Sequence, residues 1–371
     1  MKNILSVFVL CALLVAFLFR AVPSKSQEDT FTRRDMLENI ANSIILPIHL
    51  EFLNETTAFQ EAAYRFRDDP SLETLMQLQQ AWRSTSFVWE KVSVFQLGQK
   101  TLVYHSQVDN GTLVAIDAID EVLAGSDVID AAYVAGSGSN VKGLRTLEYL
   151  LFVADQDNES VLARYTTDPY AERRMQYLVA TVDVLNLTAL DIWNIWSPDG
   201  DDYITEFIES DDGSSIQESI SMMTNMMLYS LEFVVQMNIG IALGGNLGRV
   251  DPAFVNAPYS GYSLEQMRSI METIQQTFTG DGVIDGNHIG FDDYLDFLGA
   301  THDDQTLSSA IIAQLGVFID MLSSLDHDAL IQDPSLIQPL YQQGVPLIVL
   351  MKTEMASWMG ITITFTDNDS D

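Results

Sequence analysis

The sequence predicts an all-α protein in which two helical-bundle domains pack together. Apolar residues recur at helical spacing along almost the whole chain, as at Leu72, Leu75 and Leu78. The alternation typical of a strand occurs cleanly only over 361–365, which we expect to be a short extended tail. An acidic, glycine-containing stretch at 197–214 has the composition of a linker. It separates a predicted bundle over 34–196 from a second bundle over 215–371.

The first 26 residues have the pattern of a signal peptide. Lys2 supplies the positive start, an apolar run covers 4–19, and small residues at Ser24 and Ser26 suit a cleavage site. An uncleaved membrane anchor is the alternative. The single cysteine, Cys11, lies inside this segment, so a chain cleaved after Ser26 has no thiol for disulfides or metals.

The helices expected in the mature chain follow from apolar spacing and from Asp-Pro pairs. Such pairs stand at 69–70, 168–169, 251–252 and 333–334, where Asp suits the N-cap and Pro the first helical position. We expect helices at 34–66 (kinked at Pro47), 71–95, 112–124, 140–154, 169–196, 215–240, 263–279, 304–325 and 334–359.

The charge excludes some partners. The formal net charge is −34, and loss of the three basic residues of the signal segment would make it −37. Nucleic acid and anionic lipid would both be repelled, so we expect neither nucleic-acid binding nor strong membrane-surface binding. Clustered acidic residues, as over 199–202 and 209–212, fit a solvated surface or a weak attraction of metal cations.

One short helix carries the most informative residues. Leu144, Leu147 and Leu151 share an apolar face, Glu148 stands at its edge, and Arg145 lies one turn earlier. A carboxylate beside a core face has to be paired, hydrogen-bonded or functional, because burying it unpaired is costly. We expect Glu148 to be buried where the two bundles meet, balanced by Arg145 or by a helix N-terminus.

The stretch from Gly143 to Glu148 resembles the signature of the imelysin-like family, Gly-x-His-x-x-Glu, with Arg145 in place of the histidine. Further stretches similar to the family occur in the same order: Trp82 and Trp89, 256–260, 290–295 and 344–371. The resemblance implies a fold of two packed helical bundles outside the cytoplasm. Family members are associated with iron uptake and ligand binding, and some are classed as metallopeptidases.

Three interpretations of this site stay open. Arg145 and Glu148 could form only a structural contact between bundles, or a polar site in which Arg145 holds an anionic ligand. A metal centre, with Glu148 binding iron or another divalent cation, is the third. A guanidinium has no lone pair, so Arg145 cannot itself be a metal ligand.

Other candidate residues are weaker. Glu232 and Glu354 each lie in an apolar run, so each faces either a polar cavity or the wet side of its helix. None of the five histidines begins a His-x-x-Glu, and we expect His105 and His288 at the surface. The loop from Asp281 fails the calcium-loop pattern and is expected to be an ordinary connection between helices.

The sequence therefore predicts an exported protein of the periplasm or cell surface. It would be a non-catalytic component of ligand binding or uptake associated with iron acquisition. A metallopeptidase and a structural envelope protein are the alternatives. The expected partners are a small ligand or metal ion and an uptake system of the outer or inner membrane. The residues predicted to bind ligand are Gly143, Arg145, Glu148, Glu232 and Glu354.

Overall fold

The computed structural model confirms an all-helical fold. It describes residues 31–111, 114–153, 157–210, 218–244, 257–284 and 286–364. In these residues the strands are a single antiparallel pair, β1 (Thr301–His302) and β2 (Gln305–Thr306). Arg33–Asp371 form one compact unit, so the division into two bundles stays a prediction. The predicted signal segment lies outside the described residues.

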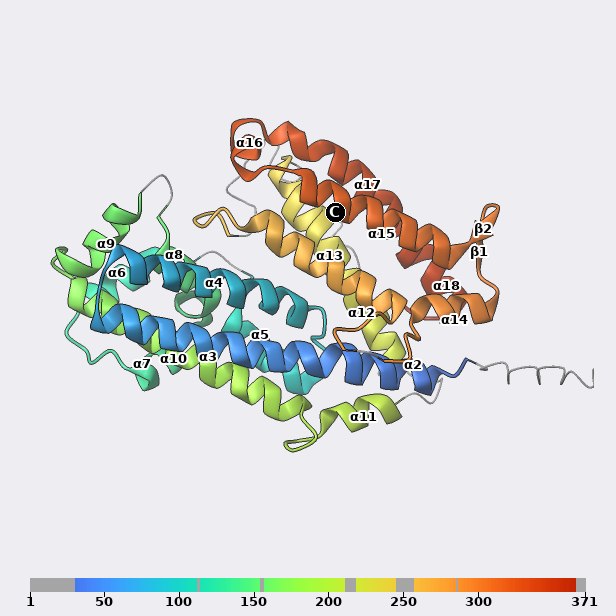
Figure 1. Cartoon of the computed structure of the whole chain (residues 1–371), viewed down its shortest axis with the longest axis horizontal. Coiled ribbons are helices and arrows are strands. Elements are labelled where there is room, and N and C mark those ends of the chain that lie inside the picture. The colour runs from blue at the N-terminus through green and yellow to red at the C-terminus, as the bar shows by residue number, and fades with distance from the viewer. Residues whose placement is uncertain are drawn as a thin grey trace, which may run out of the picture. The chain divides into compact units, whose positions relative to one another are not determined.

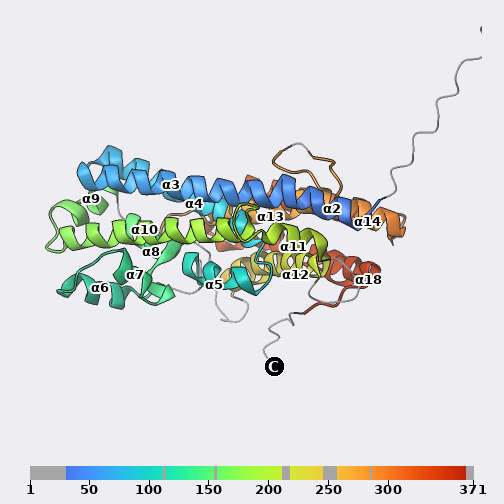
Figure 2. The same ribbon diagram turned by 90° about the horizontal axis from the view of Figure 1, so that it is seen from below.

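The helices up to residue 209 gather around one long helix. They are α2 (Arg33–Asn39), the π-helix η1 (Ile40–Ile45), α3 (Leu46–Asp68), α4 (Leu72–Ser93), α5 (Gln99–Val108), α6 (Ile116–Ala124), α7 (Ala131–Ala135), the 3-10 helix η2 (Ser139–Val141), α8 (Gly143–Leu151), α9 (Asn158–Thr166), α10 (Ala171–Trp196) and α11 (Tyr203–Glu209). Helix α10 packs against α3, α5, α7, α8 and α9. Figures 1 and 2 show α3 and α10 lying side by side.

The remaining helices, in the second half of the chain, pack largely on one another. They are α12 (Ser219–Glu232), the π-helix η3 (Phe233–Gly240), α13 (Ser263–Thr279), α14 (Phe291–Leu298), α15 (Leu307–Ser324), α16 (His327–Gln332), the 3-10 helix η5 (Pro334–Ile337), α17 (Gln338–Ile348), the π-helix η6 (Val349–Met355) and α18 (Ala356–Met359). Helix α13 contacts α15 on one side and α4 on another. Two hydrogen bonds fix the contact with α4: Gln266 Nε2 donates to Ser86 Oγ, and Ser269 Oγ donates to the Phe87 carbonyl, each at 2.6 Å.

Several helix starts differ from the prediction. At 69–70 the N-cap is Ser71 rather than Asp69, because the Ser71 hydroxyl and Thr74 form a reciprocal capping box. At 168–169 the helix begins later, at Ala171, and Asp168 instead accepts a hydrogen bond from the Tyr170 N–H. Only at 333–334 do Asp and Pro take the predicted N-cap and first positions. The pair at 251–252 lies outside the described residues.

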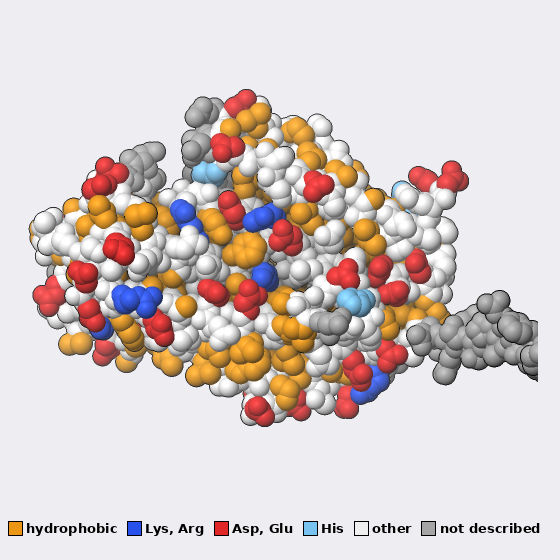
Figure 3. All heavy atoms as spheres, in the orientation of Figure 1, with side chains coloured by type: hydrophobic (Ala, Val, Ile, Leu, Met, Phe, Trp, Pro, Cys, Tyr) orange, Lys and Arg blue, Asp and Glu red, His pale blue; other side chains and the backbone are white. Residues whose placement is uncertain are grey.

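The surface and the chain end agree with the sequence. Figure 3 shows acidic side chains spread over the visible face rather than gathered in one place. The predicted extended tail is not helical over its described part, 361–364. There the Asn225 side chain donates to the Thr362 carbonyl and accepts from the Thr364 N–H, as a neighbouring strand would. Within the described ranges, two helices, α10 and α15, have the length and apolar composition of membrane spans, but both pack among other helices here.

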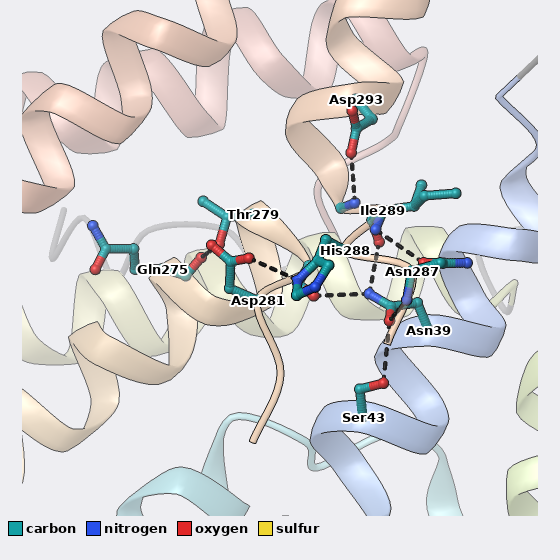
Figure 4. Close-up of polar contacts among 11 residues, drawn as sticks. Asn39, Ser43, Gln275, Thr279, Asp281, Asn287, His288, Ile289 and Asp293 are labelled. Carbon is teal, nitrogen blue, oxygen red and sulfur yellow. Dashed lines mark hydrogen bonds and ion pairs between the residues drawn. The ribbon is translucent and has the colours of Figure 1, made fainter. Parts of the chain in front are cut away.

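The loop between α13 and α14 is held by one buried asparagine (Figure 4). Asn39 Nδ2 donates to the carbonyls of Gly280, at 2.8 Å, and Ile289, at 3.1 Å. Its Oδ1 accepts from the Asn287 N–H and from Ser43 Oγ. Because Asn39 offers two donors and an acceptor from a rigid helix, it fixes both ends of the loop. The segment is an interhelical connection, as predicted.

Pro47 provides the second attachment of this loop. Proline has no N–H, so it leaves the carbonyl of Ser43, four residues earlier, without its α-helical donor. That carbonyl accepts from the Val283 N–H at 2.8 Å. A side chain at Gly282 would bring Cβ within 2.5 Å of Ser43, so only glycine fits this approach. The kink expected at Pro47 is therefore a π-helical segment, η1, just before the proline. The Ser43 carbonyl in this segment binds the loop.

We expect Asn39→Ala to lower the free energy of unfolding by about 2 kcal/mol, because buried loop carbonyls lose their donor. Asn42→Ala is the matched control. Asn42 is an exposed asparagine one turn along, whose Nδ2 donates only to the Glu38 carbonyl. Its loss should cost under about 0.5 kcal/mol. Denaturant unfolding of both variants measures the difference, and equal losses would contradict the role of Asn39 as the anchor of the loop.

Candidate functional site

Glu148 is buried, as the sequence predicted, and is held by hydrogen bonds from Tyr259 and Ser260. Only 2% of the residue is exposed. Its Oε1 accepts from the N–H groups of Tyr259, at 3.0 Å, and Ser260, at 2.8 Å, and from the Ser260 hydroxyl at 2.8 Å. These donors lie in the turn before α13, so Glu148 joins α8 to the second half of the chain. Burial raises its pKa to about 7, and the three hydrogen bonds oppose that rise.

Gly143 brings α8 against the end of α5. Its φ is +78°, a left-handed conformation that favours glycine, and a Cβ there would lie 2.3 Å from the Val108 carbonyl oxygen. A side chain at this position is therefore excluded by both strain and space. The close approach places Arg145, two residues into α8, beside Asp109, the residue that follows α5.

Arg145 pairs with Asp109, a partner that the sequence did not suggest. The guanidinium Nε lies 2.5 Å from Asp109 Oδ1, and the two side chains are 20% and 15% exposed. Glu148 was expected to be balanced by Arg145 or by a helix N-terminus. Its donors come from the turn before α13, and Arg145 acts on it through its charge, because the guanidinium forms its ion pair with Asp109. The spacing of residues within one helix suggested Glu148 as the partner of Arg145. Asp109 comes close to Arg145 only because α5 packs on α8.

A pocket of about 250 Å³ lies beside this ion pair, and we call it the Arg145 pocket. Both halves of the chain line it. The first half contributes residues of α4, α5 and α8 and the residue that follows α5: Trp89, Glu90, His105, Arg145 and Asp109. The second half contributes residues of α12, η3 and α13: Tyr229, Ser230, Phe233 and Ile270. The pocket therefore combines charged groups, neutral polar groups and aromatic rings.

Two buried titratable side chains of this pocket have strongly shifted pKa values. Burial, assisted by the charge of nearby Asp109 and opposed by that of Arg145, raises the pKa of Glu90 to about 8. Burial lowers the pKa of His105 to about 3, so the imidazole is neutral, and neither ring nitrogen has a hydrogen-bond partner. The prediction of His105 at the surface is wrong, because α5 forms a packed helix and sets this ring 4.9 Å from Trp89. His288 is exposed, as predicted.

The two other predicted carboxylates lie elsewhere. Glu232 is buried and pairs with Lys352 Nζ at 2.8 Å, beside a separate pocket of about 570 Å³. Glu354 lies 2.9 Å from His302 Nδ1. Of the five residues predicted to bind ligand, only Arg145 lines the Arg145 pocket. Gly143 and Glu148 belong to the same helix, α8, whereas Glu232 and Glu354 lie elsewhere.

Comparison with known proteins identifies the family. The Imelysin model, also designated peptidase M75, matches residues 45–340. The chain belongs to the imelysin family. An iron-regulated protein A precursor from Parabacteroides distasonis is similar in fold, with a TM-score of 0.68 and 20% identity over 91% of this chain and 97% of that one. An imelysin-like protein from Psychrobacter arcticum has a TM-score of 0.66 and 17% identity over 90% and 96%. No curated protein matches the sequence.

The residues of this imelysin do not fit a metal centre of the His–Glu kind. Arg145 stands where the family signature has histidine, and its guanidinium cannot ligate a cation. Glu148 Oε1 already accepts three hydrogen bonds. Across the described parts of the chain, no three His, Cys, Asp or Glu side chains converge as a metal site requires.

Three pocket residues of this imelysin were missed from sequence. Glu90 could have been found, because it interrupts the apolar run around Trp89, the same signal that drew attention to Glu232. Asp109 precedes Asn-Gly and resembles an ordinary turn residue. His105 stands four residues before Asp109, but a helix was doubtful there because Asn110 and Gly111 follow and α5 lacks a clear apolar stripe.

Proposed function

We propose that this imelysin is an exported, non-catalytic binding protein associated with iron acquisition, and that the Arg145 pocket is its ligand site. The observation that supports this most directly is the neutral, unpartnered His105 beside the buried Glu90 in a pocket shared by both halves of the chain. Buried polar groups without partners cost free energy, so they are expected where a ligand supplies the missing hydrogen bonds. A purely structural envelope protein would gain nothing from them.

Export and the link to iron come from different observations. The signal-peptide pattern of the first 26 residues supports a periplasmic or cell-surface location. A protein of similar fold carries the name iron-regulated protein A precursor. On this proposal the bound ligand would pass to an uptake system of the outer or inner membrane.

The source cells test location and iron response together. We expect the mature protein to begin near Gln27, to appear in the osmotic-shock or secreted fraction, and to increase severalfold when iron is restricted. Mass spectrometry of the fractions, with N-terminal sequencing, gives all three readings. Retention of Met1 in the membrane fraction would overturn export, and an abundance unaffected by iron would overturn the iron association.

Binding rather than peptidase activity gives a second prediction. Protein supplemented with zinc should show no chelator-sensitive cleavage of casein, because Arg145 removes the imidazole that a zinc peptidase needs. Glu232→Gln serves as the control for Glu148→Gln, since Glu232 is also a buried carboxylate but lies in α12 rather than α8. Cleavage that needs metal and disappears only in Glu148→Gln would establish the metallopeptidase alternative instead.

A further inference from the structure

We propose that the Arg145 pocket binds a small organic cation, with a protonated amine held by Glu90 and His105 and its carbon frame against the aromatic wall. This inference deepens the binding function proposed above and rests on it.

The charges of the pocket favour a cation. Two carboxylates, Glu90 and Asp109, face one guanidinium, Arg145. Asp109 already pairs with Arg145 at 2.5 Å, so an ionised Glu90 would have no cation of its own in direct contact. The other ionisable groups lining the pocket are neutral His105 and the Tyr229 phenol, while α13 contributes the apolar Ile270. A ligand with one positive charge would balance the second carboxylate.

The same charges disfavour an anion. An anionic ligand would have to displace Asp109 from Arg145 or lie beside Glu90 with no free positive charge to receive it. Displacing Asp109 would leave a carboxylate only 15% exposed without its ion pair, which is costly. The earlier hypothesis that Arg145 holds an anionic ligand is therefore the weaker one.

The hydrogen-bonding groups match an ammonium in number and kind. An ammonium has three N–H donors and no acceptor. Glu90 offers carboxylate oxygens from a residue only 4% exposed, and neutral His105 offers an imidazole nitrogen that has no other partner. Both side chains line the pocket, so one amine could bind the Glu90 carboxylate and also donate to the His105 nitrogen that the protein leaves without a partner.

Aromatic rings complete the site. Trp89, Tyr229 and Phe233 line the pocket, and the rings of Tyr229 and Phe233 stack at 6.5 Å between centroids. Aromatic faces attract cations through their quadrupole and also cover apolar surface. A pocket of this size suits a small molecule or one end of a larger one.

Three probes with the same ring and different charge test the proposal by calorimetry: benzylamine (as benzylammonium), benzyl alcohol and benzoate. We expect benzylammonium to bind at least about tenfold more tightly than benzyl alcohol, and benzoate not to bind. Near pH 7, titrations in buffers of different ionisation enthalpy should show about one proton released, because the cation favours the ionised form of Glu90. Equal binding of the three probes, no binding of benzylammonium, or no proton release would overturn the proposal.

Substitutions of two carboxyl residues test whether benzylammonium binds in the Arg145 pocket. Glu90→Gln keeps shape while removing the carboxylate, and should lower benzylammonium affinity at least about tenfold and abolish proton release. Asp292→Asn is the control, because Asp292 is another carboxyl with a raised pKa, in α14 and outside the pocket. Equal affinity in Glu90→Gln and wild type would overturn the proposal. The proton-release reading needs only wild-type protein, so a poorly folding variant does not block the test.

Ser230→Phe separates this inference from the proposed function. Ser230 is a buried residue of the pocket, and a phenyl group there should fill it. If benzyl alcohol or benzoate is the preferred probe and Ser230→Phe abolishes its binding, the organic cation is wrong while the pocket stands as a ligand site. If Ser230→Phe weakens no probe that wild type binds, the pocket itself is wrong.

Discussion

Arg145→Ala should lower the free energy of unfolding by about 3 kcal/mol. The variant leaves Asp109, only 15% exposed in its side chain, without the guanidinium 2.5 Å away. It also removes the cation that lowers the pKa of Glu90. The loss is therefore that of a largely buried carboxylate that keeps the Gly111 N–H but has no counter-ion. It should be recovered in part when Asp109 is also replaced, in Arg145→Ala/Asp109→Asn.

Lys100→Ala is the matched control for this experiment. Lys100 pairs with Glu206 at 3.0 Å, but the side chains are 52% and 60% exposed. Solvent screens such a pair, so its loss should cost under about 1 kcal/mol. Denaturant unfolding at constant pH compares the variants. If Arg145→Ala lowers the free energy of unfolding no more than Lys100→Ala does, the Arg145–Asp109 pair has no special role in holding α8 against α5.

Elements with strong local patterns were predictable. The predicted helix 263–279 has the observed bounds of α13, because a regular apolar stripe runs between a Gly-Tyr turn and Gly280, a left-handed C-cap. Helix α5 was missed, because its residues carry no such stripe and it is stabilised by packing on α10 and α8. Helix α11 was missed within the predicted acidic linker, although its Tyr203, Ile204 and Phe207 are buried.

The candidate site shows the same division. The burial of Glu148 could be predicted, because its neighbours Leu144, Leu147 and Leu151 define the core face of one short helix. Its hydrogen-bond partners could not, because Ser260 lies 112 residues away in the chain. Asp109 likewise reaches Arg145 only through the packing of α5. The spacing of apolar residues predicts which face of a helix is buried. Contacts between segments far apart in the chain determine which residues that face packs against.

Replacing Glu90 by glutamine should remove a large pH dependence of stability. The pKa of Glu90 is about 8 in the folded protein, against the ordinary value of 4.5. The folded state therefore binds a proton more tightly than the unfolded state between these values. The stabilisation is complete below pH 4.5 and is lost as the pH rises through 8. Glutamine mimics the protonated form, so the variant should gain stability relative to wild type as the pH rises.

The difference between Glu90→Gln and wild type should change by about 4 kcal/mol between pH 5 and pH 8, at about 1.4 kcal/mol per pH unit. Taking this difference cancels the contributions of the other shifted groups. Among these, Glu148 has a raised pKa and acts in the same direction as Glu90. His49 and His105 have lowered pKa values, so they remove stability as the pH falls below 6.5.

Asp292→Asn sets the control for this measurement, because burial raises the pKa of Asp292 only to about 6. Its difference from wild type should change between pH 4 and pH 6 and stay constant above that range. Denaturant unfolding across the pH series therefore gives the pH range over which each carboxyl changes the free energy of unfolding. A Glu90→Gln difference that is constant from pH 5 to pH 8 would mean that Glu90 ionises normally in the folded protein. The pocket would then hold a permanent charge rather than a buried acid that a cation can ionise.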